Sequence, residues 1–211
     1  MHSVFTRHAC LTLAAAAVAA LVALLAGCDP NRPSDELSKR IEMDGYSFLP
    51  PVEPGWFIAN RSADNITLLK AGDMEGQSYL IEGNHISLDG LDRSGGIVAF
   101  TEMTYRRLFP QPRFRIREHD RSGMQISGAD CALSHIITED RDPGTGSNVV
   151  TAVLIEAVGT ICVHPSRAGL GIAMTYTHRS FPEDRDRGFE ALASSVLRTQ
   201  QFGGSEQRSD Y

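Results

Sequence analysis

The sequence predicts an α+β domain in which helices pack on a β-sheet. Short runs rich in β-branched and aromatic residues fill most of the chain beyond residue 45, with turn residues such as Pro54-Gly55 between them. Two longer segments instead repeat apolar residues at the helical spacing. The expected order is therefore several strands, a helix, four strands and a final helix.

The predicted strands fall into two groups of four. Pro50-Pro51 ends the first strand, since proline cannot donate to a strand ladder. The strands are expected at residues 46–49, 56–60, 65–70 and 78–83 before the first helix, and at 114–119, 131–138, 149–163 and 171–178 after it. The turn residues at 140–147 indicate that the strands on either side form an antiparallel hairpin.

The two helices are predicted at residues 96–109 and from Pro182 onward. In the first, residues at i, i+3, i+4, i+7 and i+11 form one face, and Pro110 ends the helix. The second is expected to begin at Pro182, where a missing N–H costs nothing. Its expected buried face consists of Phe189, Leu192, Ala193 and Val196.

The first 28 residues have the pattern of an export signal. An apolar run at residues 11–25 is shorter than the roughly 20 residues that a spanning helix needs. It ends in Leu25-Ala26-Gly27-Cys28, which resembles the lipobox of a bacterial lipoprotein. The resemblance implies cleavage before Cys28, attachment of diacylglycerol to its thiol and acylation of the new amine. The alternatives are an ordinary signal peptide cleaved near Ala26 and an uncleaved anchor.

This resemblance sets the expected location and domain plan. We expect a signal peptide at residues 1–27, a lipidated flexible tether at 28–44, one domain at 45–202 and a disordered tail at 203–211. The protein would lie on the periplasmic face of the cell envelope. Asp29 resembles a signal that retains lipoproteins in the inner membrane, which favours that membrane over the outer one. The chain has 26 acidic against 20 basic residues, which argues against nucleic-acid binding.

The element order from Gly45 to Phe202 resembles the Mog1/PsbP-like α/β/α sandwich. That resemblance implies an antiparallel sheet with helices on both faces. Domains of this kind mostly act in binding or assembly. A generic α+β sandwich is the alternative.

Cys131 and Cys162 are expected to form a disulfide. Cys10 would leave with the signal peptide and Cys28 would be lipidated, so these two remain together in an oxidising compartment. A hairpin turn centred between residues 146 and 147 also places Cys131 and Cys162 directly opposite each other, within disulfide reach. A pair of free buried thiols is the alternative.

No sequence motif indicates a catalytic activity. The residue types of Cys131, His135, Cys162 and His164 suit zinc, but the predicted register places the two histidines at opposite ends of the cysteine pair. His135 and His164 therefore remain weak metal candidates. The sequence contains no Gly-x-Ser-x-Gly and no His-Glu-x-x-His, and we expect no cofactor. We thus expect a lipid-anchored, non-catalytic module that binds another envelope protein; the alternative is a periplasmic hydrolase or metal-binding enzyme with a dispersed site.

Overall fold

The fold is taken from a computed structural model, which describes residues 37–91, 95–142 and 152–203. The chain divides into two units, Met1–Arg32 and Pro33–Tyr211, and every described residue belongs to the second. The elements in chain order are β1 (Ile41–Glu42), β2 (Tyr46–Phe48), β3 (Phe57–Arg61), β4 (Asn65–Ala71), β5 (Ser78–Ser87), α3 (Ile97–Leu108), β6 (Phe114–Ile126), β7 (Ala129–Asp140), β8 (Val153–Val163), β9 (Leu170–Ser180), the 3-10 helix η1 (Pro182–Asp184), α4 (Phe189–Leu197) and β10 (Gln201–Phe202).

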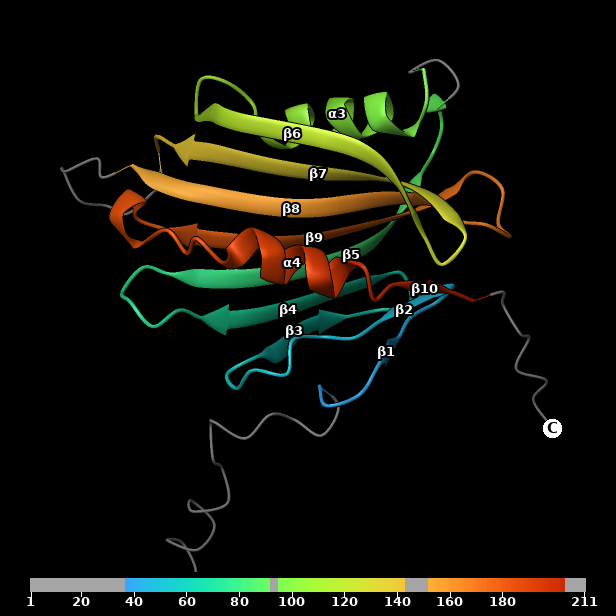
Figure 1. Cartoon of the computed structure of the whole chain (residues 1–211), viewed down its shortest axis with the longest axis horizontal. Coiled ribbons are helices and arrows are strands. Elements are labelled where there is room, and N and C mark those ends of the chain that lie inside the picture. The colour runs from blue at the N-terminus through green and yellow to red at the C-terminus, as the bar shows by residue number, and fades with distance from the viewer. Residues whose placement is uncertain (1–36, 92–94, 143–151, 204–211) are drawn as a thin grey trace, which may run out of the picture. The chain divides into compact units, whose positions relative to one another are not determined.

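A seven-stranded antiparallel sheet forms the centre of the domain (Figure 1). Its strand order is β3-β4-β5-β9-β8-β7-β6, so β3 and β6 are the two edges. After β5 the chain passes through α3 to the far edge. It then returns strand by strand until β9 pairs with β5 over ten residue pairs. The predicted α+β class and the antiparallel pairing are confirmed.

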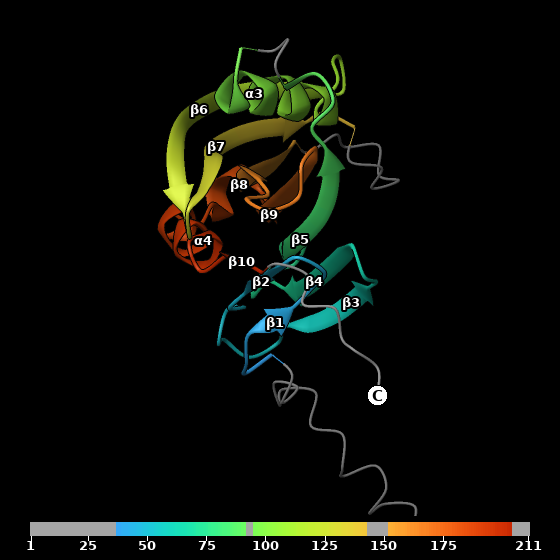
Figure 2. The ribbon, with the colours of Figure 1, turned by 90° about the vertical axis from the view of Figure 1, so that its right-hand side faces the viewer.

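The two helices pack on opposite faces of this sheet (Figure 2). Neighbouring residues of a strand point to opposite faces. On β8, Ala157 clusters with Tyr105 of α3, whereas Val158 belongs to the core cluster that contains Phe189 of α4. The sheet therefore lies between α3 and α4.

The main core lies on the α4 face. A second, three-stranded sheet of order β1-β2-β10 covers this face together with α4. Full burial of one large apolar side chain stabilises a fold by about 1.5–3 kcal/mol, so this cluster contributes strongly to the stability of the domain. The largest fully buried side chains in it are Ile41, Tyr46, Phe48, Ile66, Leu68, Ile81, Ile172, Met174, Tyr176 and Phe189.

Two glycines let tyrosine side chains approach the sheet closely. A Cβ added to Gly159 would lie 1.5 Å from the hydroxyl of Tyr105, which packs from α3 and contacts Thr175 Oγ1 at 3.0 Å. A Cβ added to Gly83 would lie 2.5 Å from the hydroxyl of Tyr46 on the opposite face. Only glycine fits at these two positions without displacing a tyrosine.

The fold begins earlier in the chain than the sequence indicated. Residues 37–44, which we assigned to a flexible tether, belong to the fold. Leu37 and Ile41 are buried, and Ile41 pairs with Phe48 in the small sheet. Their burial against the core is a tertiary contact that the polar surroundings of this segment do not reveal. The rest of the predicted tether, residues 28–36, lies outside the described residues.

The last helix also differs from the prediction. Pro182 starts the short helix η1, and the helix with the predicted buried face begins only at Phe189. Strand β6 runs to Ile126, well past the expected end at residue 119, because it pairs with β7 along its whole length. Within the described ranges, no helix is both long and apolar enough to cross a membrane.

Candidate functional site

The disulfide prediction is confirmed. Cys131 and Cys162 are bonded, with 4.0 Å between their Cα atoms, and they face each other directly across β7 and β8. The predicted register holds for the whole hairpin from this pair to Asp140 and Val153. The turn itself lies in residues 143–151, outside the described part of the chain.

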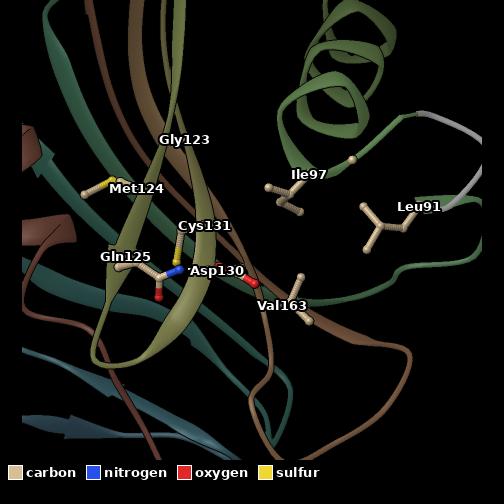
Figure 3. A pocket seen from close by; sticks show the side chains of 9 residues that line it. Leu91, Ile97, Gly123, Met124, Gln125, Asp130, Cys131 and Val163 are labelled. Atoms are coloured by element: carbon tan, nitrogen blue, oxygen red, sulfur yellow. Dashed lines mark hydrogen bonds between the residues drawn. The ribbon is translucent and has the colours of Figure 1, made fainter.

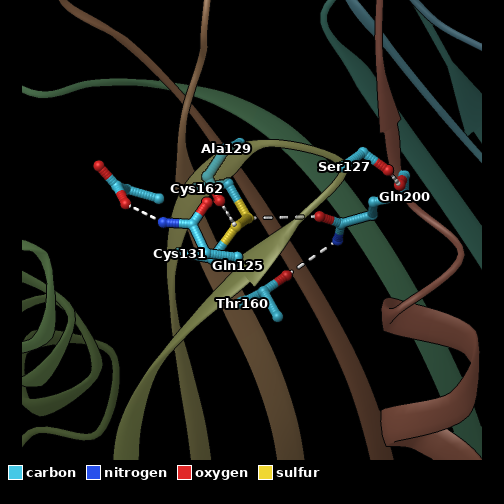
Figure 4. The surroundings of a disulfide bond; sticks show 8 residues. Gln125, Ser127, Ala129, Cys131, Thr160, Cys162 and Gln200 are labelled. Atoms are coloured by element: carbon cyan, nitrogen blue, oxygen red, sulfur yellow. Dashed lines mark hydrogen bonds between the residues drawn. A yellow bond between two sulfur atoms is a disulfide. The ribbon is translucent and has the colours of Figure 1, made fainter.

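The disulfide also fixes the C-terminal end of the fold (Figure 4). The side chain of Gln200 is fully buried, and its Oε1 lies 3.5 Å from Cys162 Sγ while its Nε2 donates to Thr160 Oγ1 at 2.8 Å. Ser127 Oγ donates to the Gln200 carbonyl at 2.8 Å. Because Gln200 directly precedes β10, these contacts couple the cystine to the small sheet.

A buried charge cluster lies on the α4 face of the sheet. The Nε2 of His135 on β7 donates to Glu156 Oε1 on β8 at 2.8 Å, and Arg185 donates to both oxygens of Glu156 at 2.7 and 3.0 Å. These hydrogen bonds overcome the effect of burial and lower the pKa of Glu156 to about 2. Glu156 in turn raises the pKa of His135, with a smaller contribution from the nearby Glu190.

His178 extends this cluster across the sheet without joining its hydrogen bonds. It pairs with Glu156 across β8 and β9, and its ring stacks on Tyr79 at 4.5 Å between centroids. Neither ring nitrogen has a hydrogen-bond partner among the described residues. Burial lowers the pKa of His178, against the opposing effect of the nearby Asp186 and Glu156. The ring is therefore an apolar packing element in its neutral form.

The weak metal candidates are separated in space. His164 Nε2 donates to the carbonyl of Gly45 at 2.9 Å, so this side chain fastens the loop before β2. His135 and His164 lie on opposite sides of the cystine by register, roughly 20 Å apart along the strands. The disulfide removes both thiolates. Over the described ranges, no group of three or more His, Cys, Asp or Glu is arranged to hold a metal ion.

A cavity lies on the opposite face, beside the start of α3 (Figure 3). Its volume is about 680 Å³. Apolar side chains of Leu91, Ile97 and Val163 line one side, and Gln125 and Asp130 from the β6–β7 hairpin line the other. Gln125 Nε2 donates to Asp130 Oδ1, so these two side chains form one polar group at the rim. The arrangement can bind a ligand with an apolar body and a hydrogen-bond donor.

Sequence reasoning missed Glu156, Arg185 and the cavity. Glu156 is the one acid in the apolar run at residues 153–163, and this isolated charge was a usable signal for a buried partner. Arg185 had no such signal, because its contact depends on where the segment between η1 and α4 lies on the sheet. Cys28 and Asp29, the predicted lipidation and sorting residues, lie outside the described residues.

Comparisons with known proteins give the fold no family name. No protein-family description matches the sequence, and no curated protein matches it. Among solved structures, a protein from Bacteroides thetaiotaomicron VPI-5482 aligns over 79% of this chain with 13% identity and a TM-score of 0.40. Human STARD10 aligns over 67% of both chains with 12% identity and a TM-score of 0.26. This chain spans about half (49%) of the length of the Bacteroides protein.

Proposed function

We propose that this protein is a bacterial envelope lipoprotein whose folded domain binds another envelope protein without catalysing a reaction. The sequence Leu25-Ala26-Gly27-Cys28 after an apolar run supports the lipid anchor. The cystine supports export, because disulfides persist in oxidising compartments such as the periplasm. We further propose the periplasmic face of the inner membrane as its location, on the strength of Asp29 alone.

The proposed fold family is the Mog1/PsbP-like α/β/α sandwich. An antiparallel sheet with one helix on each face supports this assignment. Members of that family mostly act in binding or assembly, which agrees with the proposed role.

The cavity beside α3 is the observation that carries the binding role. It combines apolar walls at Leu91, Ile97 and Val163 with the polar side chains of Gln125 and Asp130, and recognition sites also join apolar surface to a few polar groups. The charge cluster around Glu156 has a different character. Arg185 occupies both carboxylate oxygens, and among the described residues no Ser, Thr or Cys hydroxyl or thiol is hydrogen-bonded to His135. We therefore assign a structural role to that cluster.

Site-specific photocrosslinking in living cells tests the binding role. A photoreactive residue replaces Ile97 in the cavity or, as a matched control, Met103 on the exposed side of the same helix. We expect a defined protein adduct from position 97 alone, which disappears when Val163→Arg fills the cavity. Equal adducts from both positions, or an adduct that survives Val163→Arg in a variant with unchanged thermal unfolding, would contradict the proposal.

Fatty-acid labelling tests the anchor. Wild-type protein should incorporate a labelled fatty acid and sediment with membranes, and Cys28→Ala should lose both properties. Density-gradient separation of the two membranes with Asp29→Ser as the comparison tests the location. If Cys28→Ala remains labelled and membrane-bound, the lipoprotein assignment is wrong.

A further inference from the structure

The loop between β2 and β3 exposes an apolar surface that the fold itself does not use. Val52 is 85% exposed, Phe57 at the start of edge strand β3 is 53% exposed and Leu49 is 43% exposed. These are three of the six large hydrophobic side chains that are exposed in the described part of the chain. Within residues 49–57 the one charged residue is Glu53. It forms an ion pair with Lys70, whose Nζ lies 2.6 Å from Glu53 Oε2.

This exposure belongs to a firmly held loop. Pro50, Pro51 and Trp56 are buried, and the Trp56 ring packs edge-on against Tyr176 at 5.6 Å between centroids. The backbone N–H of Leu49 donates to Thr199 Oγ1 at 2.8 Å. The loop is thus fixed at both ends and presents Val52 outward in a set position. A rigid apolar projection loses little conformational entropy when a surface covers it.

The loop lies at the end of the domain where the chain enters the described fold. The chain enters the described fold at Leu37, only nine residues after Cys28. At 3.3–3.6 Å per residue these nine residues reach about 30 Å at full extension. The start of β1 and the β2–β3 loop lie together at the lower end of the domain in both views, while α3 lies at the opposite end (Figures 1 and 2).

We infer that the β2–β3 loop, through Val52 and Phe57, is the part of the domain that rests on and inserts into the lipid bilayer. This inference builds on the proposed lipid anchor, because the anchor brings the lower end of the domain to the membrane. The apolar side chains of the loop insert into the bilayer, and attraction between charges contributes little to this contact. The contact orients the domain so that α3 and the cavity face away from the bilayer.

A fluorescent probe in the full lipidated protein tests the contact. Val52→Cys carries an environment-sensitive dye, and Met103→Cys on α3 is the matched control, since its side chain is also exposed (40%). Both proteins are reconstituted in phosphatidylethanolamine–phosphatidylglycerol vesicles, with or without spin-labelled lipid as quencher. We expect blue-shifted emission and several-fold stronger quenching at position 52 than at 103. Phe57→Asp should reduce the quenching at position 52 while the protein stays in the vesicle fraction.

The possible outcomes separate this inference from the lipid anchor. If the protein is vesicle-bound and the two positions are quenched equally, the inference fails and the anchor stands. A blue shift at position 52 without quenching by spin-labelled lipid would mean that a protein covers the loop, which also overturns the inference. If wild-type and Cys28→Ala proteins both stay soluble, the anchor fails and the inference fails with it.

Discussion

Replacing the buried carboxylate Glu156 by glutamine should destabilise the domain by about 3 kcal/mol at pH 7. The magnitude follows from the pKa of Glu156, which the fold lowers from 4.5 to about 2. Each pKa unit corresponds to about 1.4 kcal/mol of preference for the charged form. Removing one partner of a buried ion pair costs about 3–5 kcal/mol in other proteins, and the amide that remains in Glu156→Gln favours the low end.

The same pKa makes the effect depend on pH in a defined direction. A carboxylate whose pKa is lowered by folding stabilises the native state fully above its unfolded pKa of 4.5. That contribution disappears as the pH falls through about 2. At pH 3 the difference between wild type and Glu156→Gln should therefore shrink to about 1 kcal/mol.

Urea unfolding at pH 7 and pH 3, followed by circular dichroism, measures both quantities. Glu53→Gln is the control, because Glu53 likewise pairs with a basic residue, Lys70, but its side chain is 42% exposed. An exposed pair of this kind contributes less than about 1 kcal/mol. A loss below about 1 kcal/mol for Glu156→Gln at pH 7, or a loss that is equal at both pH values, would refute the reasoning.

Three further predictions concern stability and are measured by the same unfolding assay. Replacing Cys131 and Cys162 together by alanine should lower the free energy of unfolding by about 3–4 kcal/mol, because the disulfide closes a loop with a sequence separation of 31. Reductant should lower the stability of the wild type by a similar amount and leave that of the double variant unchanged. Gly159→Ala should cost about 1–3 kcal/mol of stability, because the added Cβ collides with Tyr105. Much of this loss should vanish in a Tyr105→Leu background. If the stability losses of the two substitutions simply add, the close contact is contradicted. His178→Phe should stabilise the domain by about 1 kcal/mol at pH 8, because it removes two buried ring nitrogens that have no hydrogen-bond partner within the described ranges. Since the fold lowers the pKa of His178, the wild type loses stability as the pH falls below about 6.5. The stability difference between His178→Phe and the wild type should therefore be larger at pH 5.5 than at pH 8. A constant or smaller difference would argue against a buried neutral ring.

Local sequence patterns were sufficient for most elements and for the disulfide. The β-branched runs and the helical spacing predicted the larger strands and both helices, because these patterns reflect which side of an element is buried. The pairing of Cys131 with Cys162 could be predicted because a hairpin register depends only on where its turn is centred. Two-residue strands such as β1 and β10 carry no periodic pattern, so they were missed.

The candidate sites depended on contacts between distant parts of the chain. Leu37 is buried only because the small sheet closes over the core, and nothing in its local composition indicates this. Arg185 meets Glu156 because the segment after η1 lies over the α4 face, although the two residues are 29 positions apart in the sequence. The cavity likewise joins Leu91, Ile97 and Val163, which neighbour one another only after the sheet has curved around α3.

The sequence by itself determined the fold class and the pairing of the two hairpin cysteines, because periodicity and hairpin register are encoded locally. The lipid anchor at Cys28 stays a prediction from the sequence. Only the tertiary structure decided which charges are buried together, where the cavity forms and which apolar side chains stay exposed. Those properties arise from the packing of strands and helices that are far apart in the chain, and short-range patterns in the sequence do not specify that packing.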